Sequence, residues 1–208
     1  MILALRKRWV LWAACAALVV LLGLLSATAI FLWGVYVRHW EGPVVTAVAK
    51  VIPVPAASLG DRRVLLREYL ADVRSVKIFL ASEEATAAGV ARDIAIDDRR
   101  EALERLLHER ALQETAEARA ITVTPEQTKA VMDEFGVSAT STEAFADFLE
   151  RGYGWTVADF ESHVVQPLIL TRLLSSSFAA DHDGDLTAFD QYLLERLARK
   201  DVVRYIRF

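Results

Sequence analysis

The chain has 208 residues, of which 54% are apolar and 25% charged, and its mean hydropathy of +0.27 is too high for an average soluble protein. The first 40 residues hold four of the 24 Lys and Arg side chains and none of the 28 Asp and Glu side chains, so the rest carries a net charge of about −8. This charge disfavours binding to nucleic acid or anionic lipid, because both require compensating cations.

A transmembrane helix is predicted at residues 9–37, because this run contains no charged residue and a bilayer is crossed by about 20 helical residues. Residues 1–8 form a basic tail with Arg6, Lys7 and Arg8, which places the N-terminus in the cytoplasm and the remainder outside. Two alternatives involve processing. Cleavage after Ala29 fits the small residues Ala27 and Ala29, but the apolar run continues past them. Lipidation of Cys15, the single cysteine, is less well supported than burial in the span.

Residues 38–56 are predicted to be an extended connector, because three prolines and many β-branched residues follow the span. Residues 57–208 then form the external domain. It begins with two short extended pieces on either side of a tight turn at Gly60-Asp61.

The apolar spacing predicts one helix from Leu65 to about Ala88, closed by Gly89, and a second from Asp97 to Ala120. A third helix begins with Thr124 as N-cap, Pro125 in the first turn and Gln127 completing a capping box, and it ends at Phe135-Gly136.

The fourth helix, within residues 141–154, is capped by Ser141 or Thr142 and stopped by two glycines. Its buried face is predicted to consist of Phe145, Phe148 and Leu149. Thr156 opens a longer helix with a kink at Pro167. The apolar positions of that helix are Val157, Phe160, Val164 and Leu168.

A last helix within residues 185–200 should point Leu186, Phe189, Leu193 and Leu197 inward, and residues 201–208 alternate as a strand does. A terminal strand needs a partner, and the extended pieces around Gly60 are the ones available. The fold class is therefore mainly α, with an N-terminal transmembrane helix and an external helical domain whose first and last strands form a small sheet.

No catalytic, cofactor-binding or metal site is predicted. Asp181 to Asp185 resembles the start of a calcium loop, but Leu186 stands where glycine is needed and Tyr192 where an acid is needed. The stretch is better interpreted as a turn with Asp185 as N-cap. The four histidines lack metal-ligand spacing, and Ser175-Ser176-Ser177 lacks a nucleophile elbow.

An aromatic cluster around residues 145–160 is the candidate binding site, because it could present a sticky surface to apolar peptide. Packing at the junction of two helices is the favoured interpretation for most of it, with the two aromatic residues of the turn left partly exposed. The candidates are Tyr153, Trp155, Phe145, Phe148 and Phe160.

Taken in order, four stretches resemble the N-terminal chaperone domain of the SurA family, which is related in fold to the peptide-binding part of trigger factor. They are ASLGDRRVLLREYL, RREALERLLHERALQETA, RAITVTPEQT and FADFLERGYGWTVADF, within residues 57–178. Two positions depart from the family pattern: Leu59-Gly60-Asp61 replaces an asparagine-glycine turn, and Ala120 stands where the family often has glycine. Only 30 residues follow Phe178, too few for the prolyl isomerase domain that many members carry, so no enzyme activity is expected.

The resemblance implies a membrane-anchored, extracytoplasmic chaperone of the bacterial envelope that binds unfolded or nascent secreted polypeptide without catalysis or cofactor. An alternative is a structural or assembly subunit, or an adaptor derived from a degraded enzyme, that holds one specific membrane or envelope partner. No oligomeric state is predicted.

Overall fold

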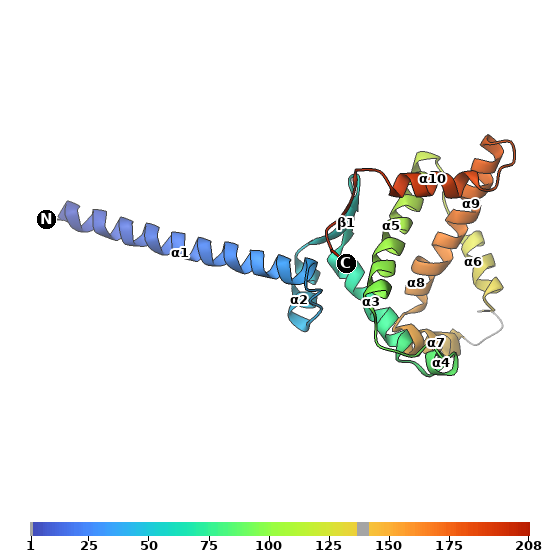
Figure 1. Cartoon of the computed structure of the whole chain (residues 1–208), viewed down its shortest axis with the longest axis horizontal. Coiled ribbons are helices and arrows are strands. Elements are labelled where there is room, and N and C mark those ends of the chain that lie inside the picture. Colours follow the sequence, from blue (N-terminus) through green and yellow to red (C-terminus); the bar gives the residue numbers. More distant parts are fainter. Residues whose placement is uncertain (1, 137–141) are drawn as a thin grey trace.

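The computed structural model describes residues 2–136 and 142–208, and the side chains of 17–136 and 143–208. It is mainly helical, with a small three-stranded sheet, as predicted. A long helix, α1 (Ile2–Tyr36), projects from a helical domain (Figure 1). Its Ala17–Tyr36 part is long and apolar enough to cross a membrane, and only 11% of its most apolar window is buried, unlike a core helix.

The two ends of the external domain meet in one sheet, as the sequence predicted. Strand β1 (Pro55–Leu59) lies between β2 (Arg62–Leu65) and β3 (Val202–Arg204), and both pairings are antiparallel. The hairpin turns at Gly60-Asp61, where Gly60 has a φ of 57°. Leu59 pairs with Val202, which joins the first and last elements of the domain.

The predicted connector is partly wrong, because α2 (Pro43–Val51) is a helix. Proline lacks an amide hydrogen, but at the first helical position none is needed, and so Pro43 starts the helix instead of preventing it. Val45 and Ala49, four residues apart, are both buried against the domain. Helical spacing of the valines thus outweighs their preference for strands.

The helix predicted from Leu65 to Ala88 is two helices, α3 (Leu66–Leu80) and α4 (Glu83–Ala87). Ser82 separates them, because its hydroxyl accepts a hydrogen bond from the amide of Ala85 at 3.1 Å and so caps α4. The next helix, α5 (Ile96–Ala118), agrees with the prediction within two residues.

The end of α5 explains the unusual Ala120. The amide of Ala120 donates to the carbonyl of Glu117 at 3.1 Å, and the amide of Ile121 donates to that of Ala116 at 2.8 Å. These two bonds define a Schellman motif, whose central residue adopts left-handed backbone angles. Ala120 has a φ of 53°, a conformation that favours glycine.

Helix α6 (Pro125–Glu134) begins as predicted: the hydroxyl of Thr124 accepts from the amide of Gln127 at 3.3 Å, and the Gln127 side chain accepts in return at 2.9 Å. Helix α7 spans Thr142–Tyr153, and the proposed cap Ser141 and the side chain of Thr142 lie outside the described part. Gly152 lies inside α7 and does not stop it. The predicted buried face is correct for Leu149 but wrong for Phe148, which is 41% exposed.

The long helix after Thr156 is interrupted close to the predicted kink. It consists of α8 (Val157–Phe160), a π-helical turn η1 (Glu161–Val165) and α9 (Gln166–Asp181), with Pro167 directly after the turn. A π-turn inserts one extra residue per turn, which rotates everything that follows. Val165 and Ile169 are therefore the buried residues, in place of the predicted Val164 and Leu168.

Helix α10 (Ala188–Leu197) buries Phe189 and Leu193, as predicted, whereas Leu197 is half-buried and Leu186 is exposed. Asp181 to Asp185 form the predicted turn, but Asp185 is not the N-cap. That position belongs to Thr187, and the carboxylate of Asp185 accepts the Thr187 amide at 2.8 Å just before α10 begins. Leu186 lies in this turn, which explains its exposure.

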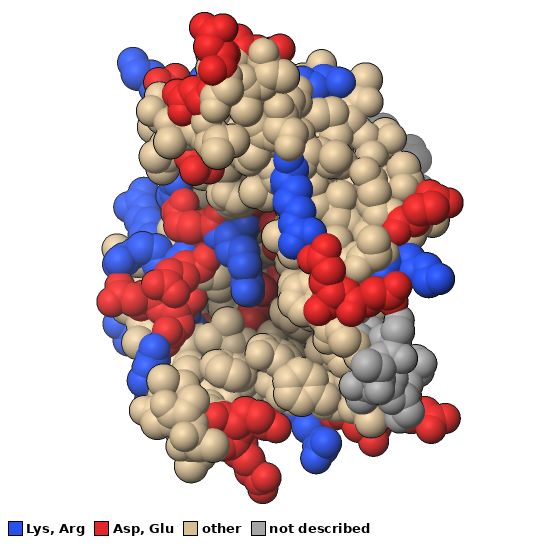
Figure 2. All heavy atoms as spheres, turned by 90° about the vertical axis from the view of Figure 1, so that its right-hand side faces the viewer, with Lys and Arg blue, Asp and Glu red and all other residues tan. Residues whose placement is uncertain are grey.

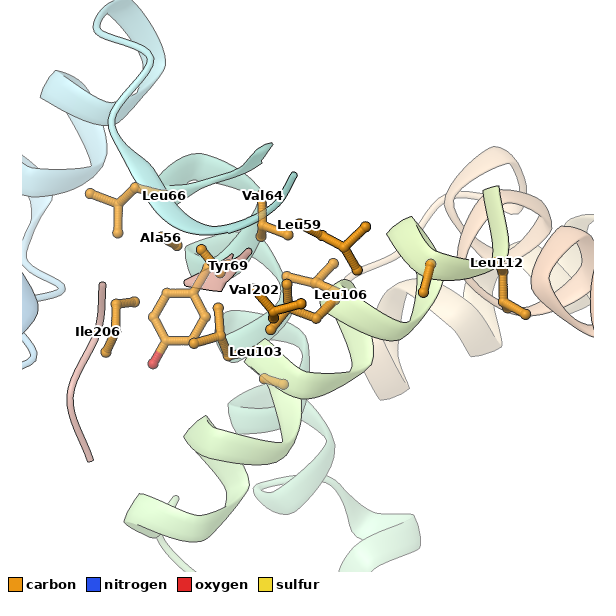
Figure 3. Close-up of a cluster of buried hydrophobic side chains, with 14 of the residues drawn as sticks. Ala56, Leu59, Val64, Leu66, Tyr69, Leu103, Leu106, Leu112, Val202 and Ile206 are labelled. Atoms are coloured by element: carbon orange, nitrogen blue, oxygen red, sulfur yellow. The ribbon is translucent and has the colours of Figure 1, made fainter. Parts of the chain in front are cut away.

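Two clusters of buried side chains hold the domain together. The larger one combines the sheet, α2, α3, α5 and α10 with the last turn of α1, and Figure 3 shows its side chains from β1, β2, α3, α5 and the C-terminal segment pointing toward one another. The smaller cluster contains Val131, Leu149, Phe160, Val165 and Ile169, and it holds together α6, α7, α8, η1 and α9. The groove described next lies where α3 meets the α7–α8 turn.

Candidate functional site

A groove of about 390 Å³ separates α3 from the turn between α7 and α8. This volume falls within the range of about 300–1,000 Å³ that is typical of ligand pockets. Leu70 and Ile78 of α3 line one wall, and Tyr153, Gly154 and Trp155 line the other.

Four ring systems stack in a row along this groove. Phe79 of α3 stacks on Tyr153 with ring centroids 5.3 Å apart, Tyr153 on Trp155 at 5.1 Å, and Trp155 on His163 of η1 at 5.6 Å. We call these four residues the aromatic row. Each is half-buried, so each keeps part of its ring surface in solvent. Phe148 extends the row, with its ring edge-on to Tyr153 at 6.2 Å.

Gly154 sets the path of the turn that carries Tyr153 and Trp155. Its φ of 66° lies in the left-handed region, and a Cβ at this position would be 2.6 Å from Cδ1 of Ile78. Only glycine meets both conditions without strain. The close approach of this turn to α3 therefore fixes the two aromatic side chains beside the groove.

A polar cluster lies next to the row, and its Asp72 and His163 line the groove. The carboxylate of Asp72, which is buried, binds the guanidinium of Arg105, and Nδ1 of His163 lies 3.9 Å from the buried carboxylate of Glu109. The Glu109 carboxylate raises the pKa of His163 above its ordinary value, against the opposing effect of burial. His163 thus links the aromatic row to this polar cluster.

The rim of the groove is basic. Arg67 and Arg74 of α3 and Lys50 of α2 line it, and none of the three forms an ion pair within the described residues. On the face at the right of Figure 1 the charge is mixed, with basic and acidic side chains interspersed (Figure 2). The rim therefore presents three cations without an ion pair among the described residues, on a domain that is negative overall.

The structure divides the five predicted site residues between the groove and the core. Tyr153 and Trp155 line the groove, and Phe148 lies beside it. Phe160 is buried in the smaller cluster, and Phe145 is half-buried against it with ring centroids 5.3 Å apart. These last two position α7 and α8 and offer little surface to a ligand.

Three contributors to the site were missed in the sequence: Phe79, Ile78 and His163. Phe79 and Ile78 lie in the last turn of α3 and were not among the predicted site residues. His163 had no metal-ligand spacing and so had no apparent role. Their meaning depends on α3 meeting the α7–α8 turn, and no local pattern encodes that contact.

The other histidines have separate roles. His39 and His182 stack on Phe208 and Phe178, and burial lowers the pKa of His108. Asp181 accepts a hydrogen bond from Arg119 at 2.6 Å. Within the described residues, no three His, Cys, Asp or Glu side chains come together in a way that could hold a metal ion.

Comparisons of this chain with known protein families, with curated proteins and with solved structures find no match.

Proposed function

We propose that this protein is a membrane-anchored, chaperone-like protein that binds extended apolar segments of unfolded or nascent secreted polypeptide in the groove beside α3. Binding involves neither catalysis nor a cofactor. The observation that carries the proposal is the aromatic row of half-exposed rings along a groove of suitable size. The sequence resemblance to the SurA chaperone domain supports it independently.

The row suits transient binding. Each aromatic contact contributes about 0.5–1.5 kcal/mol beyond area burial, so four such contacts add about 2–6 kcal/mol, a range that includes the roughly 4 kcal/mol of a millimolar complex. A client held this weakly is released without an energy source. The helix α1 offsets the low affinity, because anchoring beside the membrane raises the local concentration of binding sites for emerging chains.

The basic tail at residues 6–8 places the N-terminus in the cytoplasm and the domain outside. A reporter enzyme fused after Phe208 should therefore be active only outside the cytoplasm. Activity confined to the cytoplasm would refute this orientation.

A second candidate is a subunit that holds one specific protein partner. The free cations on the rim, Lys50, Arg67 and Arg74, favour it, because they would suit acidic side chains at fixed positions in a partner. A general chaperone has less use for such a fixed pattern of charge.

The two candidates are separated by client range. The full chain in lipid nanodiscs is mixed with several unrelated unfolded proteins, and their aggregation is followed by light scattering. A chaperone suppresses aggregation of most of them, and Trp155→Ala weakens the effect, whereas Leu194→Ala, at an exposed position of α10, does not. Trp155→Phe keeps a ring in place and should retain most of the activity. No suppression, together with one stoichiometric partner in a pull-down, would favour the second candidate.

A further inference from the structure

Helix α2 exposes apolar side chains on the side opposite its buried face, which is unusual for a short helix at a protein surface. Its sequence, PVVTAVAKV, contains one charged residue. Val45 and Ala49 are buried in the main core, whereas Val44 and Val51 are 71% and 84% exposed. Thr46 and Lys50, four residues apart, form a polar face, so one apolar side of α2 stays open beyond the side that packs on the domain.

The open side of α2 forms a continuous strip. Val44, Ala47 and Val51 follow the i, i+3, i+7 spacing of one helix face, and the exposed Ile52 extends it by one residue. We call these four residues the outer strip. Lys50 is exposed next to Val51.

The position of α2 along α1 indicates what covers the outer strip. Val45 and Ala49 share one buried cluster with Val35 in the last turn of α1, and Figure 1 shows α2 beside the end of α1, at the edge of the domain nearest the rest of that helix. The ring of Trp40 packs directly on Gly34, where a Cβ would overlap it. Helix α2 is therefore held at the level of the last turn of α1.

That level corresponds to the headgroup region of a bilayer. The uncharged run starts at Trp9, and about 20 helical residues cross the hydrocarbon, which ends near Ile30. The following turn, from Phe31 to Tyr36, packs on the domain. Val35 then lies roughly 8 Å beyond the hydrocarbon at 1.5 Å per residue. Trp33 and Trp40 are exposed at this level, where tryptophan is enriched in membrane proteins.

A set of contacts braces the junction between α1 and the domain on which α2 packs. The hydroxyl of Tyr36 donates to the carbonyl of Pro55 at 2.9 Å, and the carbonyl of Tyr36 accepts from the amide of Arg207 at 2.9 Å. The carboxylate of Glu41 binds both Lys77 and Arg99. Because the junction is braced on both sides, the outer strip points in one fixed direction.

We infer that α2 is an interfacial helix whose outer strip lies in the boundary between headgroups and acyl chains of the bilayer that α1 spans. The inference rests on the membrane anchoring in the proposed function. Apolar helix faces insert about 5–10 Å into this boundary, and α2, held beside the headgroups at the level of Val35, lies close enough for its outer strip to do so. The ammonium of Lys50 can reach lipid phosphate from the end of the strip. The lipid surface thereby holds the domain in one orientation, with its groove at a set height above the membrane.

The test uses the full chain with Cys15→Ser, reconstituted in phosphatidylcholine vesicles, with single cysteines that carry an environment-sensitive fluorophore. Val44→Cys and Val51→Cys report on the outer strip. Leu186→Cys and Leu194→Cys are matched controls, because these leucines are similarly exposed, at 73% and 70%, but lie before and within α10. Leu22→Cys, in the span, reports on anchoring.

The inference predicts that both strip probes emit at shorter wavelength than the controls and lose most of their emission when lipids carry a spin label near the top of the acyl chain. The Leu22 probe responds instead to a label deep in the chain. If the Leu22 probe is quenched but the strip probes behave as the controls do, the inference is wrong and the anchoring stands. If the strip probes are shifted but not quenched by lipid, a protein surface covers the strip, which also refutes it. If the Leu22 probe is not quenched either, anchoring and inference fail together.

Discussion

The docking of α1 onto the domain gives the sharpest prediction about stability. Val35, in the last turn of α1, is 2% exposed within the main core, and Val37, two residues later, is 43% exposed. Val35→Ala removes two buried methyl groups, worth about 0.8 kcal/mol each, and the cavity adds to this loss. The domain should lose about 2 kcal/mol of stability. Val37→Ala should change it by less than about 0.5 kcal/mol.

Hydrogen exchange in the core helix α5 measures this effect in lipid nanodiscs. Amides such as those of Leu103 and Leu107, both buried, exchange only when the domain opens widely. A loss of about 2 kcal/mol corresponds to roughly 30-fold faster exchange in Val35→Ala. Equal exchange in the two variants would show that α1 is a loose tether, and the fixed orientation argued for α2 would lose its basis.

Three further predictions concern the groove and its surroundings. Glu109 raises the pKa of His163 in the folded state, so the stabilisation is complete below the unfolded value of about 6.5 and is lost as pH rises through the folded pKa. Urea unfolding of the parent chain and of His163→Gln should therefore differ most at acidic pH, and a constant difference would contradict this account. Ala120→Gly should stabilise the domain by about 1 kcal/mol, because glycine adopts the left-handed backbone of this position without strain. Ala118→Gly, within the helix, should instead destabilise the domain by about 0.5–1 kcal/mol. Thermal unfolding compares the two variants, and a loss of stability in both would refute the Schellman interpretation. Gly154→Ala should weaken client binding, because the added Cβ shifts Trp155. Gly152→Ala, with nothing within 4 Å of the added Cβ, should leave client binding unchanged when both variants are titrated with the same unfolded client. Equal binding by the two variants would show that the turn does not position the row.

Helix starts and ends were predicted best where a local contact decides them. Thr124 and Thr156 cap their helices by bonds to residues three positions later, and such contacts follow from the local sequence. The terminal strand could be predicted because its apolar and polar residues alternate. Its pairing followed because a strand needs a partner. In each case the sequence contains both members of the interaction, or leaves a single partner available.

The errors arose where tertiary packing selects among local alternatives. The valines of α2 fit a strand or a helix, and burial of Val45 and Ala49 against the core decides for the helix. The π-turn before Pro167 shifts the buried face by one residue, a change that apolar spacing cannot reveal. Phe148 has the right spacing for burial, yet among the described residues only the ring of Tyr153 contacts its ring, and it stays exposed.

The candidate site was predictable in part. Tyr153 lies between Gly152 and Gly154, and Trp155 follows Gly154 in the turn, a setting that leaves large rings near the surface. Their partners Phe79 and His163 lie far away in the chain, and only the fold brings them into the aromatic row. A chain of similar composition could have buried all four.

The central claim is that unfolded polypeptide binds along the groove beside the aromatic row. A photo-reactive phenylalanine analogue in place of Phe148, at the lip of the groove, tests it directly in the full chain in nanodiscs. The same analogue in place of Leu186, which is exposed before α10, is the matched control. On irradiation with several unfolded clients, the analogue at position 148 should crosslink to each of them and the one at 186 to none. Equal yields at the two positions, or no client crosslink at 148, would contradict the account.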